Sequence, residues 1–259
     1  MSSLVQDNGL IIRAIRHGET SLIVTAFTPK TGKIGLIAKG ARAKTRAGSS
    51  GGLELFNELQ LVYYHKAGRD LQLLKEWSVS EPHIGLRASF ECMTIASAVL
   101  ELLNRCLHDD DPHEDLFGAA RETLSALDMN PRAPLPILWS FEMRLFRELG
   151  FGLRLRECAF SNRPLTPPYR GNIRYRLSDG GFYHPDVPAA QSRDGELSGE
   201  AFALLSNLAS ASYEFAGRIR ISPATQTELL QFFARYLETH LPVRGNLRSL
   251  EALRWGKQT

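Results

Sequence analysis

The first 80 residues of the chain contain five short apolar runs that are separated by turn-forming segments. Such runs are typical of β-strands when they are rich in β-branched and aromatic side chains. Five short strands within so little chain predict a small β-barrel of the OB type. The runs cover residues 10–12, 22–27, 34–38, 59–64 and 71–77.

Helical spacing replaces the strand pattern after residue 80. Apolar side chains recur at helical intervals in residues 88–107, 115–127 and 135–149. Gly150 follows the third of these stretches, in the position where glycine commonly ends a helix. We expect three consecutive helices that pack through their apolar faces.

Residues 152–195 interrupt this helical pattern. They are rich in Gly, Pro, Arg and Ser, and a small hairpin is predicted around residues 179–181. Helical spacing returns at 196–212 and at 222–241, where Ser222 can cap the second helix. The sequence thus predicts an α+β multidomain chain with an OB-fold domain, an all-α domain and an insertion. The predicted parts are residues 1–80, residues 81–151 with 196–250, and residues 152–195.

The composition is that of an ordinary globular chain, with 43% hydrophobic and 23% charged residues in 259. No stretch approaches the roughly 18–20 apolar residues that span a bilayer, and no signal peptide is visible at the N-terminus. Cys92, Cys106 and Cys158 are too few and too scattered for a disulfide framework. We expect a cytoplasmic location.

Positive charge is concentrated at the N-terminal end. Residues 1–50 contain eight Lys or Arg and two acidic residues, a net +6, whereas the whole chain carries +3, so residues 51–259 sum to −3. This asymmetry indicates a polyanionic partner, and nucleic acid is the commonest. Cations on the loops of a small barrel can follow a phosphate backbone. The predicted DNA-binding residues are Arg13, Arg16, Lys30, Lys33, Lys39, Arg42, Lys44 and Arg46, with Lys30 and Lys33 ranked second.

Several aromatic side chains accompany these cations. Unpaired bases stack on exposed aromatic rings, although strand aromatics are more often buried. We expect core positions for Phe27 and Phe56. Residues 39–52, which carry several of the cations, are predicted to form a mobile loop. The stacking candidates are Tyr63, Tyr64, Phe27, Phe56 and His17.

An acidic and histidine-rich segment at residues 108–113 is the main candidate for metal-dependent chemistry. Carboxylates and imidazoles can hold a divalent ion for nuclease activity. However, the segment joins two predicted helices, where Asp and Pro are ordinary turn residues. No nucleophile, base and orienting group occur together, so no catalytic residue and no cofactor are predicted.

Two segments in combination point to a family. AKGAR at residues 38–42 and FEMRLF followed by LGF at residues 141–151 are fairly specific together. Through them the chain resembles the bacterial RecO family of recombination mediators over essentially its whole length. Further matching residues are Gly18-Glu19, residues 24–28, Gly32-Lys33, Leu71, Leu74-Lys75-Glu76 and Cys158.

The resemblance implies a fold, an activity and partners. RecO-like proteins have an N-terminal OB barrel, a helical domain and a zinc-ribbon-like insertion. They bind single- and double-stranded DNA, anneal complementary strands, and help load the RecA recombinase onto DNA coated by single-strand-binding protein. Their partners are RecR and the C-terminal tail of single-strand-binding protein. We therefore expect a nucleoid-associated mediator that is not an enzyme and does not contact membranes.

The chain departs from the family pattern at the metal. Many members carry two C-x-x-C pairs in the insertion, whereas this chain keeps Cys158 and has Ser161, His184 and Val187 at the other ligand positions. Structural zinc needs four ligands, so no zinc is predicted. The insertion is expected to be held by packing of Phe160, Tyr175, Phe182 and Tyr183.

A second surface is expected to bind a partner peptide. Acidic tails with an apolar end dock where a basic side chain borders an apolar groove. Each candidate has an ordinary alternative as a surface ion pair, for instance between Glu142 and Arg144 or Arg147. The alternatives to the mediator are a metal-dependent nuclease using residues 108–113 and a general OB-fold RNA-binding protein. The partner-binding candidates are Arg121, Arg132, Arg144 and Arg147.

Overall fold

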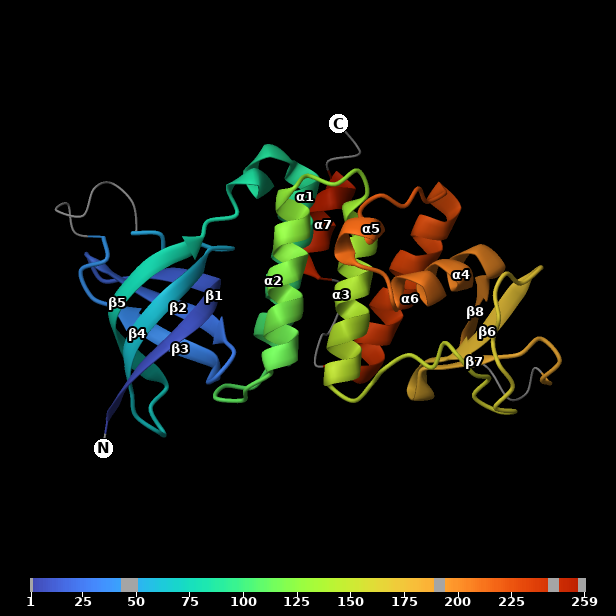
Figure 1. Ribbon diagram of the computed structural model, residues 1–259, viewed down its shortest axis with the longest axis horizontal. Helices are drawn as coiled ribbons and strands as arrows, with labels where there is room; N and C mark the ends of the chain where they lie inside the picture. The colour runs from blue at the N-terminus through green and yellow to red at the C-terminus, as the bar shows by residue number, and fades with distance from the viewer. Residues whose placement is uncertain (1, 43–50, 189–193, 242–246, 256–259) are drawn as a thin grey trace. The chain divides into compact units, whose positions relative to one another are not determined.

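The protein is described here from a computed structural model, and the described residues are 2–42, 51–188, 194–241 and 247–255 (Figure 1). The chain divides into two compact units. Unit 1 comprises residues 1–130 and 247–259, and unit 2 comprises residues 131–246. The chain therefore leaves unit 1 after its second long helix and returns to it at residue 247.

Unit 1 begins with five strands whose pairing closes into a barrel in the order β1-β2-β3-β5-β4. All strand pairs are antiparallel except β3 with β5. The ring closes because β1 is long enough to pair with β4 along its first half and with β2 along its second half. The strands are β1 (Ser3–His17), β2 (Ser21–Thr28), β3 (Gly32–Ala38), β4 (Glu58–His65) and β5 (Leu71–Glu81).

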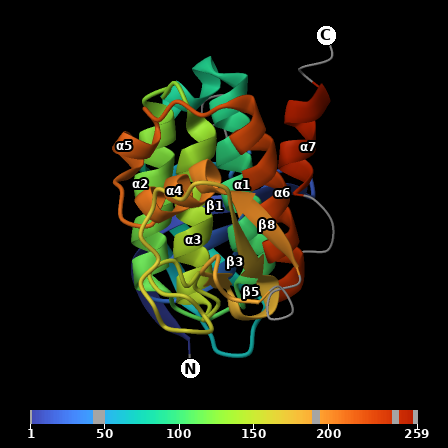
Figure 2. The ribbon, with the colours of Figure 1, turned by 90° about the vertical axis from the view of Figure 1, so that its right-hand side faces the viewer.

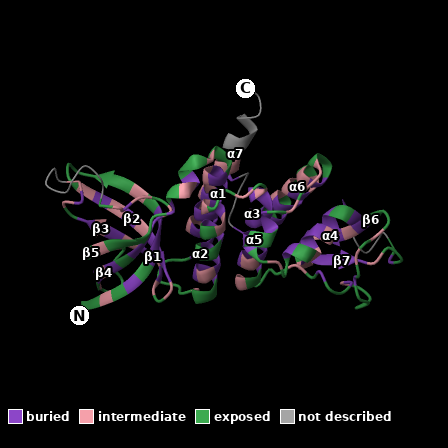
Figure 3. Cartoon of the chain, turned by 45° about the horizontal axis from the view of Figure 1, so that its top comes forward, coloured by how far each residue is buried: buried purple, intermediate pink, exposed green. Residues whose placement is uncertain are grey.

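The interior of the barrel is formed by alternate residues of each strand. In β2, Leu22, Val24 and Ala26 are buried, whereas Ile23 and Thr25 between them are partly exposed. Buried residues alternate with more exposed ones along the strands in Figure 3. Successive strand side chains point to opposite faces, so each strand contributes one row to the core. The buried core comprises Ile11, Leu22, Val24, Ala26, Ile34, Leu36, Ala38, Ala41, Leu53, Leu59, Leu61, Tyr63 and Leu74.

A short 3-10 helix and two long helices follow the barrel within unit 1. The side chain of Ser89 caps α1 by accepting a hydrogen bond from the Cys92 N–H. Phe117 of α2 packs edge-on against Phe27 of β2, with ring centroids 5.7 Å apart. This contact seats α2 on the barrel. The elements are η1 (Ile84–Ala88), α1 (Phe90–Cys106) and α2 (Glu114–Asp128).

Helix α7 (Arg248–Trp255) brings the chain back to unit 1 and packs against α1. The first N–H groups of a helix lack partners within it. Here the Glu101 carboxylate of α1 accepts from the N–H groups of Arg248 (3.1 Å) and Ser249 (3.0 Å) and from the Ser249 hydroxyl (2.7 Å). Arg105 donates to the same carboxylate at 2.9 Å. Burial opposes ionisation of Glu101, but these hydrogen bonds outweigh it and lower the pKa of the carboxyl.

Helices of unit 2 pack through a cluster of aromatic rings. Phe146 of α3 lies with its ring centroid 4.8 Å from that of Tyr236 and 6.2 Å from that of Phe233, both on α6. Ser222 caps α6, and Pro223 occupies its first turn, as the sequence predicts. The helices are α3 (Pro134–Glu148), α4 (Gly199–Leu208), α5 (Tyr213–Ala216) and α6 (Pro223–His240).

A small antiparallel sheet completes unit 2 (Figure 2). Its strand order is β7-β6-β8, and η2 (Leu177–Asp179) connects β6 to β7. Phe182 of β7 contacts the rings of Phe202 on α4 (5.0 Å) and Phe232 on α6 (5.9 Å), so both helices cover the sheet. The strands are β6 (Asn172–Arg176), β7 (Gly181–Tyr183) and β8 (Gly195–Ser198).

The α+β architecture with five N-terminal strands followed by helices is confirmed. The predicted hairpin is present as β6 and β7, but β8 and α7 were not anticipated, and β1 is much longer than the expected run. The division into three domains stays a prediction. Within the described ranges, no helix is both long and apolar enough to cross a membrane.

Candidate nucleic-acid interface

Three of the predicted DNA-binding residues gather at one end of the barrel. Arg16 is aligned with Leu22 across β1 and β2, and Leu22 is aligned with Ala38 across β2 and β3. Lys39 directly follows Ala38, so it lies about 10 Å from Arg16, which is two strand spacings. Both side chains are exposed.

Arg42 joins this end of the barrel through the turn between β1 and β2. Its backbone N–H donates to the Thr20 carbonyl at 2.8 Å, and its guanidinium lies 3.4 Å from the Glu19 carbonyl. We call Arg16, Lys39 and Arg42 the cationic rim; Glu19 is an exposed acidic residue on the same turn. Lys44 and Arg46 lie outside the described residues.

Arg13 lies on the outer surface of the barrel, three residues before Arg16. It is exposed and aligned with Thr25, which is aligned in turn with Gly35. A β-bulge between Ile11 and Arg13 shifts the register of β1 at this point. Arg13 is therefore a further exposed cation on β1, three residues before Arg16.

Lys30 and Lys33 lie at the opposite end of the barrel and are engaged there. Lys30 is on the turn between β2 and β3, and its backbone N–H donates to Asp7 at 3.3 Å. The Lys33 ammonium is 3.3 Å from Asp109 and donates to the Asn104 carbonyl at 3.1 Å. The Lys33 side chain is only 14% exposed. Lys33 is thus held by contacts within unit 1, whereas Lys30 is exposed; the role of both in DNA binding stays a prediction.

The aromatic candidates divide by burial. Phe27 and Tyr63 are fully buried, and Tyr63 is hydrogen-bonded to the Thr31 hydroxyl at 2.7 Å. Phe56 is half-buried. Tyr64 is 39% exposed and His17 is exposed, so these two rings remain available to bases.

Two cations on the turn between β4 and β5 are not among the residues predicted from the sequence. Lys66 and Arg69 are exposed on the turn between β4 and β5. The buried Gln72 orders this turn by donating to the carbonyls of Lys66 (3.0 Å) and Arg69 (2.7 Å). A polar residue inside the apolar run Leu71–Leu74 is the sequence feature that could have revealed this ordered turn.

The acidic segment 108–113 does not assemble a metal site. Asp109 pairs with Lys33, Asp110 Oδ1 lies 3.6 Å from His65 Nε2, and Asp111 Oδ2 lies 3.4 Å from His113 Nε2. Each carboxylate therefore faces a different base. In the part of the chain that the structure describes, no group of three or more His, Cys, Asp or Glu is arranged to hold a metal ion. The nuclease alternative has no support in this geometry.

The partner-binding candidates lie in different surroundings. Arg121 in α2 is 3.1 Å from the largely buried Glu58. Burial raises the pKa of Glu58, although Arg121 opposes the shift. In unit 2, the Arg144 guanidinium lies 4.6 Å from the centroid of the Tyr213 ring. Arg132 and Arg147 are exposed.

Glu142 of α3 forms no ion pair among the residues that the structure describes. It is 2% exposed, and its Oε2 atom has no hydrogen-bond partner among the described residues. Burial raises the pKa of its carboxyl to about 8, so the group is largely protonated at neutral pH. The alternative of a surface ion pair at Glu142 is therefore wrong, because the residue is buried.

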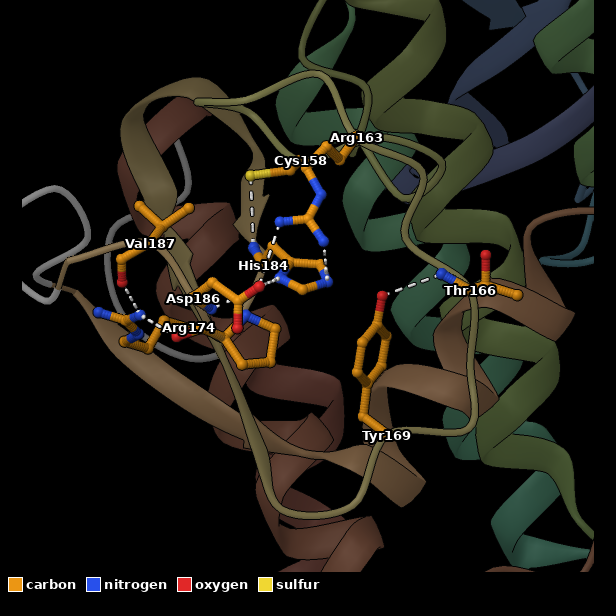
Figure 4. A network of polar contacts seen from close by, with 9 residues as sticks. Cys158, Arg163, Thr166, Tyr169, Arg174, His184, Asp186 and Val187 are labelled. Carbon is orange, nitrogen blue, oxygen red and sulfur yellow. Dashed lines mark hydrogen bonds and ion pairs between the residues drawn. The ribbon is translucent and has the colours of Figure 1, made fainter.

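The insertion is built around Cys158 without the ligands of a zinc site (Figure 4). The Cys158 sulfur accepts from the His184 N–H at 3.3 Å. Burial opposes ionisation, but hydrogen bonds from Ser161, His184 and Phe160 outweigh it and lower the pKa of the thiol. The His184 ring contacts Asp186 at 3.2 Å, and Val187 has no ligand atom. This donor set does not fit structural zinc.

Packing of the insertion differs in one residue from expectation. Tyr175, Phe182 and Tyr183 are buried, as predicted. Phe160 is 56% exposed because it lies at the tip of the turn after Cys158, so it does not hold the insertion together.

Comparison with known proteins decides the family. The model of the recombination protein O N-terminal domain matches residues 1–83, and that of its C-terminal domain matches residues 87–251. The chain belongs to the RecO family. The cationic rim and Arg13 lie within the N-terminal match, and Cys158 lies within the C-terminal match.

Curated relatives agree with this assignment over nearly full length. The DNA repair protein RecO of Anaeromyxobacter sp. (strain Fw109-5) is 31% identical, with 93% of each chain covered. That of Salinibacter ruber is 30% identical over 90% of this chain and 88% of the relative. That of Prosthecochloris aestuarii is 30% identical over 97% of this chain and 98% of the relative.

Proposed function

We propose that this member of the RecO family acts in DNA repair and recombination as a mediator that is not an enzyme. It binds single- and double-stranded DNA, anneals complementary strands, and helps load the RecA recombinase onto DNA coated by single-strand-binding protein. The observation that carries the proposal is the gathering of Arg16, Lys39 and Arg42 at one rim of the barrel.

The barrel itself supports an OB-type assignment. OB folds are five-stranded barrels that bind oligonucleotides on strands 2 and 3 and on the loops between strands 1 and 2 and between strands 4 and 5. The cationic rim adjoins the first of these loops, and Lys66 and Arg69 lie on the second. Arg13 is aligned with Thr25 of β2, so it lies along the strands between the levels of these two loops.

Charge neutralisation gives this surface a mechanism for annealing. Complementary strands repel each other through their phosphates, and cations that replace counterions reduce that repulsion. Tyr64 and His17 are exposed rings on which unpaired bases can stack while the strands meet. No covalent step and no cofactor is required.

The protein partners belong to the same proposal. We propose RecR and the C-terminal tail of single-strand-binding protein as partners, with the tail docking near Arg121, Arg132, Arg144 or Arg147. Of these, Arg144 has its guanidinium over the Tyr213 ring, 4.6 Å from the centroid. A carboxylate of the tail would gain a charge-assisted hydrogen bond beside any exposed guanidinium among the four.

Charge reversal tests the DNA-binding surface. We expect the variant Arg16→Glu with Lys39→Glu and Arg42→Glu to bind single-stranded DNA more weakly, and its slope of log affinity against log salt to fall by about 2, which is roughly 0.7 for each of three lost phosphate contacts. Arg87→Glu on η1 is the single-charge control, since Arg87 is exposed and lies outside the barrel. An unchanged slope in the triple variant would contradict the proposal.

An annealing assay tests the activity and the partner together. Complementary strands coated with single-strand-binding protein are mixed with this chain, and the experiment is repeated with a coating protein that lacks its C-terminal tail. We expect annealing that depends on the tail, without cleavage of labelled DNA in magnesium or manganese. Cleavage would favour the nuclease alternative instead, and equal affinity for matched RNA would favour a general RNA-binding protein.

A further inference from the structure

The segment that follows α3 in unit 2 is rich in arginine. Residues 151–170 contain four arginines, one glutamate and no lysine or aspartate, a net +3 in 20 residues. All four guanidinium-bearing residues are exposed. This charge lies far along the chain from the N-terminal barrel, and the proposed DNA-binding surface does not use it. The arginines are Arg154, Arg156, Arg163 and Arg170.

In the part of the chain that the structure describes, the guanidinium groups of three of these arginines have no polar partner. Within the described residues, no hydrogen bond or ion pair holds the guanidinium groups of Arg154, Arg156 or Arg170. Arg163 is partly neutralised, since it donates to Asp186 at 3.1 Å and lies 3.5 Å from the His184 ring (Figure 4). Unpaired guanidinium groups are suited to bidentate contact with phosphate.

The backbone that carries these side chains is well ordered by hydrogen bonds. The Cys158 N–H donates to the Arg163 carbonyl at 2.8 Å, and the Leu165 N–H donates to the Arg156 carbonyl at 2.8 Å. The resulting turn is fixed to the sheet by a bond from the Ala159 N–H to the Phe182 carbonyl at 2.9 Å. We call residues 154–165 the arginine hairpin.

Phe160 lies at the tip of the arginine hairpin between its two arms. Arg156 belongs to the first arm and Arg163 to the second, and the Phe160 side chain is 56% exposed. Leu155 and Leu165 of the same hairpin are buried, whereas Phe160 is not part of the core. An exposed ring flanked by arginines is the combination that binds unpaired bases and their phosphates.

We infer that the arginine hairpin is a second contact for single-stranded DNA, with Phe160 stacking on a base and Arg154 and Arg156 binding the flanking phosphates. The inference rests on the proposed function, because it adds a strand contact to the same activity. Single strands are favoured over duplexes because a duplex offers no free base face along its length for Phe160.

Unit 2 provides a matched control site on and after α5. Phe215 is 57% exposed, and Arg218 and Arg220 follow it with the same spacing as Arg154 and Arg156. Arg218 is paired with Glu214, so this site carries less free positive charge. Variants at the two sites remove the same chemical groups from equally exposed positions.

The test measures affinity for a fluorescent oligo-dT strand over a range of salt concentrations. We expect Phe160→Ala to weaken binding at least about fivefold, and Phe215→Ala to leave it unchanged. We expect Arg154→Glu with Arg156→Glu to lower the salt slope by about 1.4, and Arg218→Glu with Arg220→Glu to change it much less. Equal effects at the two sites, or wild-type binding by both hairpin variants, would overturn the inference.

Two comparisons separate this inference from the proposed function. If the triple variant of the cationic rim binds normally while the hairpin variants are weakened, the rim assignment fails and the hairpin contact stands. If only the rim variant is weakened, the hairpin inference fails and the proposed function stands. Phe160→Ala should also affect duplex DNA much less than oligo-dT, and an equal loss on both would refute stacking.

Discussion

The Glu101 carboxylate and the Ser249 N–H are hydrogen-bonded at 3.0 Å although 148 positions separate them in the chain. Unit 2, residues 131–246, makes up most of that separation. A carboxylate from α1 thus supplies the cap for a helix that the chain forms only after it has completed the other unit. The stability of unit 1 should therefore depend on a side chain outside the barrel.

We predict that Glu101→Gln destabilises unit 1 by about 2 kcal/mol at pH 7, because charge-assisted hydrogen bonds to the α7 N-terminus and Arg105 are weakened. The pKa of Glu101 is lowered by folding from 4.5, so its stabilisation is present above that value and is lost as pH falls further. Urea denaturation at pH 7 and pH 4 should show a smaller difference at pH 4. Glu91→Gln on the exposed side of α1 is the control and should change stability by under about 0.5 kcal/mol.

The contribution of Glu142 to stability should depend on pH in the opposite direction to that of Glu101, and the variant Glu142→Gln tests this. The folded pKa of about 8 lies above the unfolded value of 4.5, so the unfolded state releases its proton first and stability falls as pH rises between these values. We expect the variant to be more stable than the wild type by about 1–4 kcal/mol at pH 9 and similar to it at pH 5. Thermal denaturation across this range measures the effect. Glu148→Gln, in the same helix but less buried, should give no such trend.

Gly32→Ala should disrupt the docking of the segment 108–113 on the barrel. Gly32 has φ 80°, and a Cβ atom there would lie 2.1 Å from the Asp111 carbonyl oxygen. We expect a loss of about 3 kcal/mol or more from strain and displacement of backbone. Gly40→Ala is matched, with φ 66° and no atom within 4 Å of the added Cβ. It should cost only about 1–2 kcal/mol in chemical denaturation.

Substitution of Lys33 should lower stability, whereas substitution of Arg16 should lower DNA affinity. Lys33→Ala removes a contact with Asp109 and Asn104, so we expect a loss of up to about 1 kcal/mol in stability and little change in affinity. Arg16→Ala should leave stability within about 0.5 kcal/mol and lower the single-strand salt slope by about 0.7. Each of the two variants is measured by denaturation and by salt-dependent binding of single-stranded DNA. A larger affinity loss for Lys33→Ala would return Lys33 to the interface.

Local pattern was enough to predict most of the elements. The alternation of Leu22, Val24 and Ala26 fixes which face of β2 is buried, and Ser222 with Pro223 fixes the start of α6. Both depend on residues that are neighbours in the chain. The return of α7 was not predictable in this way, because its cap comes from Glu101 in another helix.

The sequence predicts which charged residues are present near the candidate site, but not which of them are exposed there. A count of charges treats Lys33 and Lys39 alike, but the fold buries the first against Asp109 and leaves the second exposed. Lys66 and Arg69 were missed because they lie beyond the first 50 residues, although strand register brings their turn near β3. Position in the fold, rather than charge, separates these lysines.

The capping of α7 by Glu101 has a consequence during synthesis. After α1 has emerged from the ribosome, all of unit 2 must still be translated before α7 emerges. At typical rates this translation takes on the order of ten seconds. For that interval the nascent chain exposes the face of α1 that α7 later covers. We expect chaperones that bind exposed apolar surfaces to bind unit 1 early in synthesis and to dissociate from it only after α7 has packed against α1.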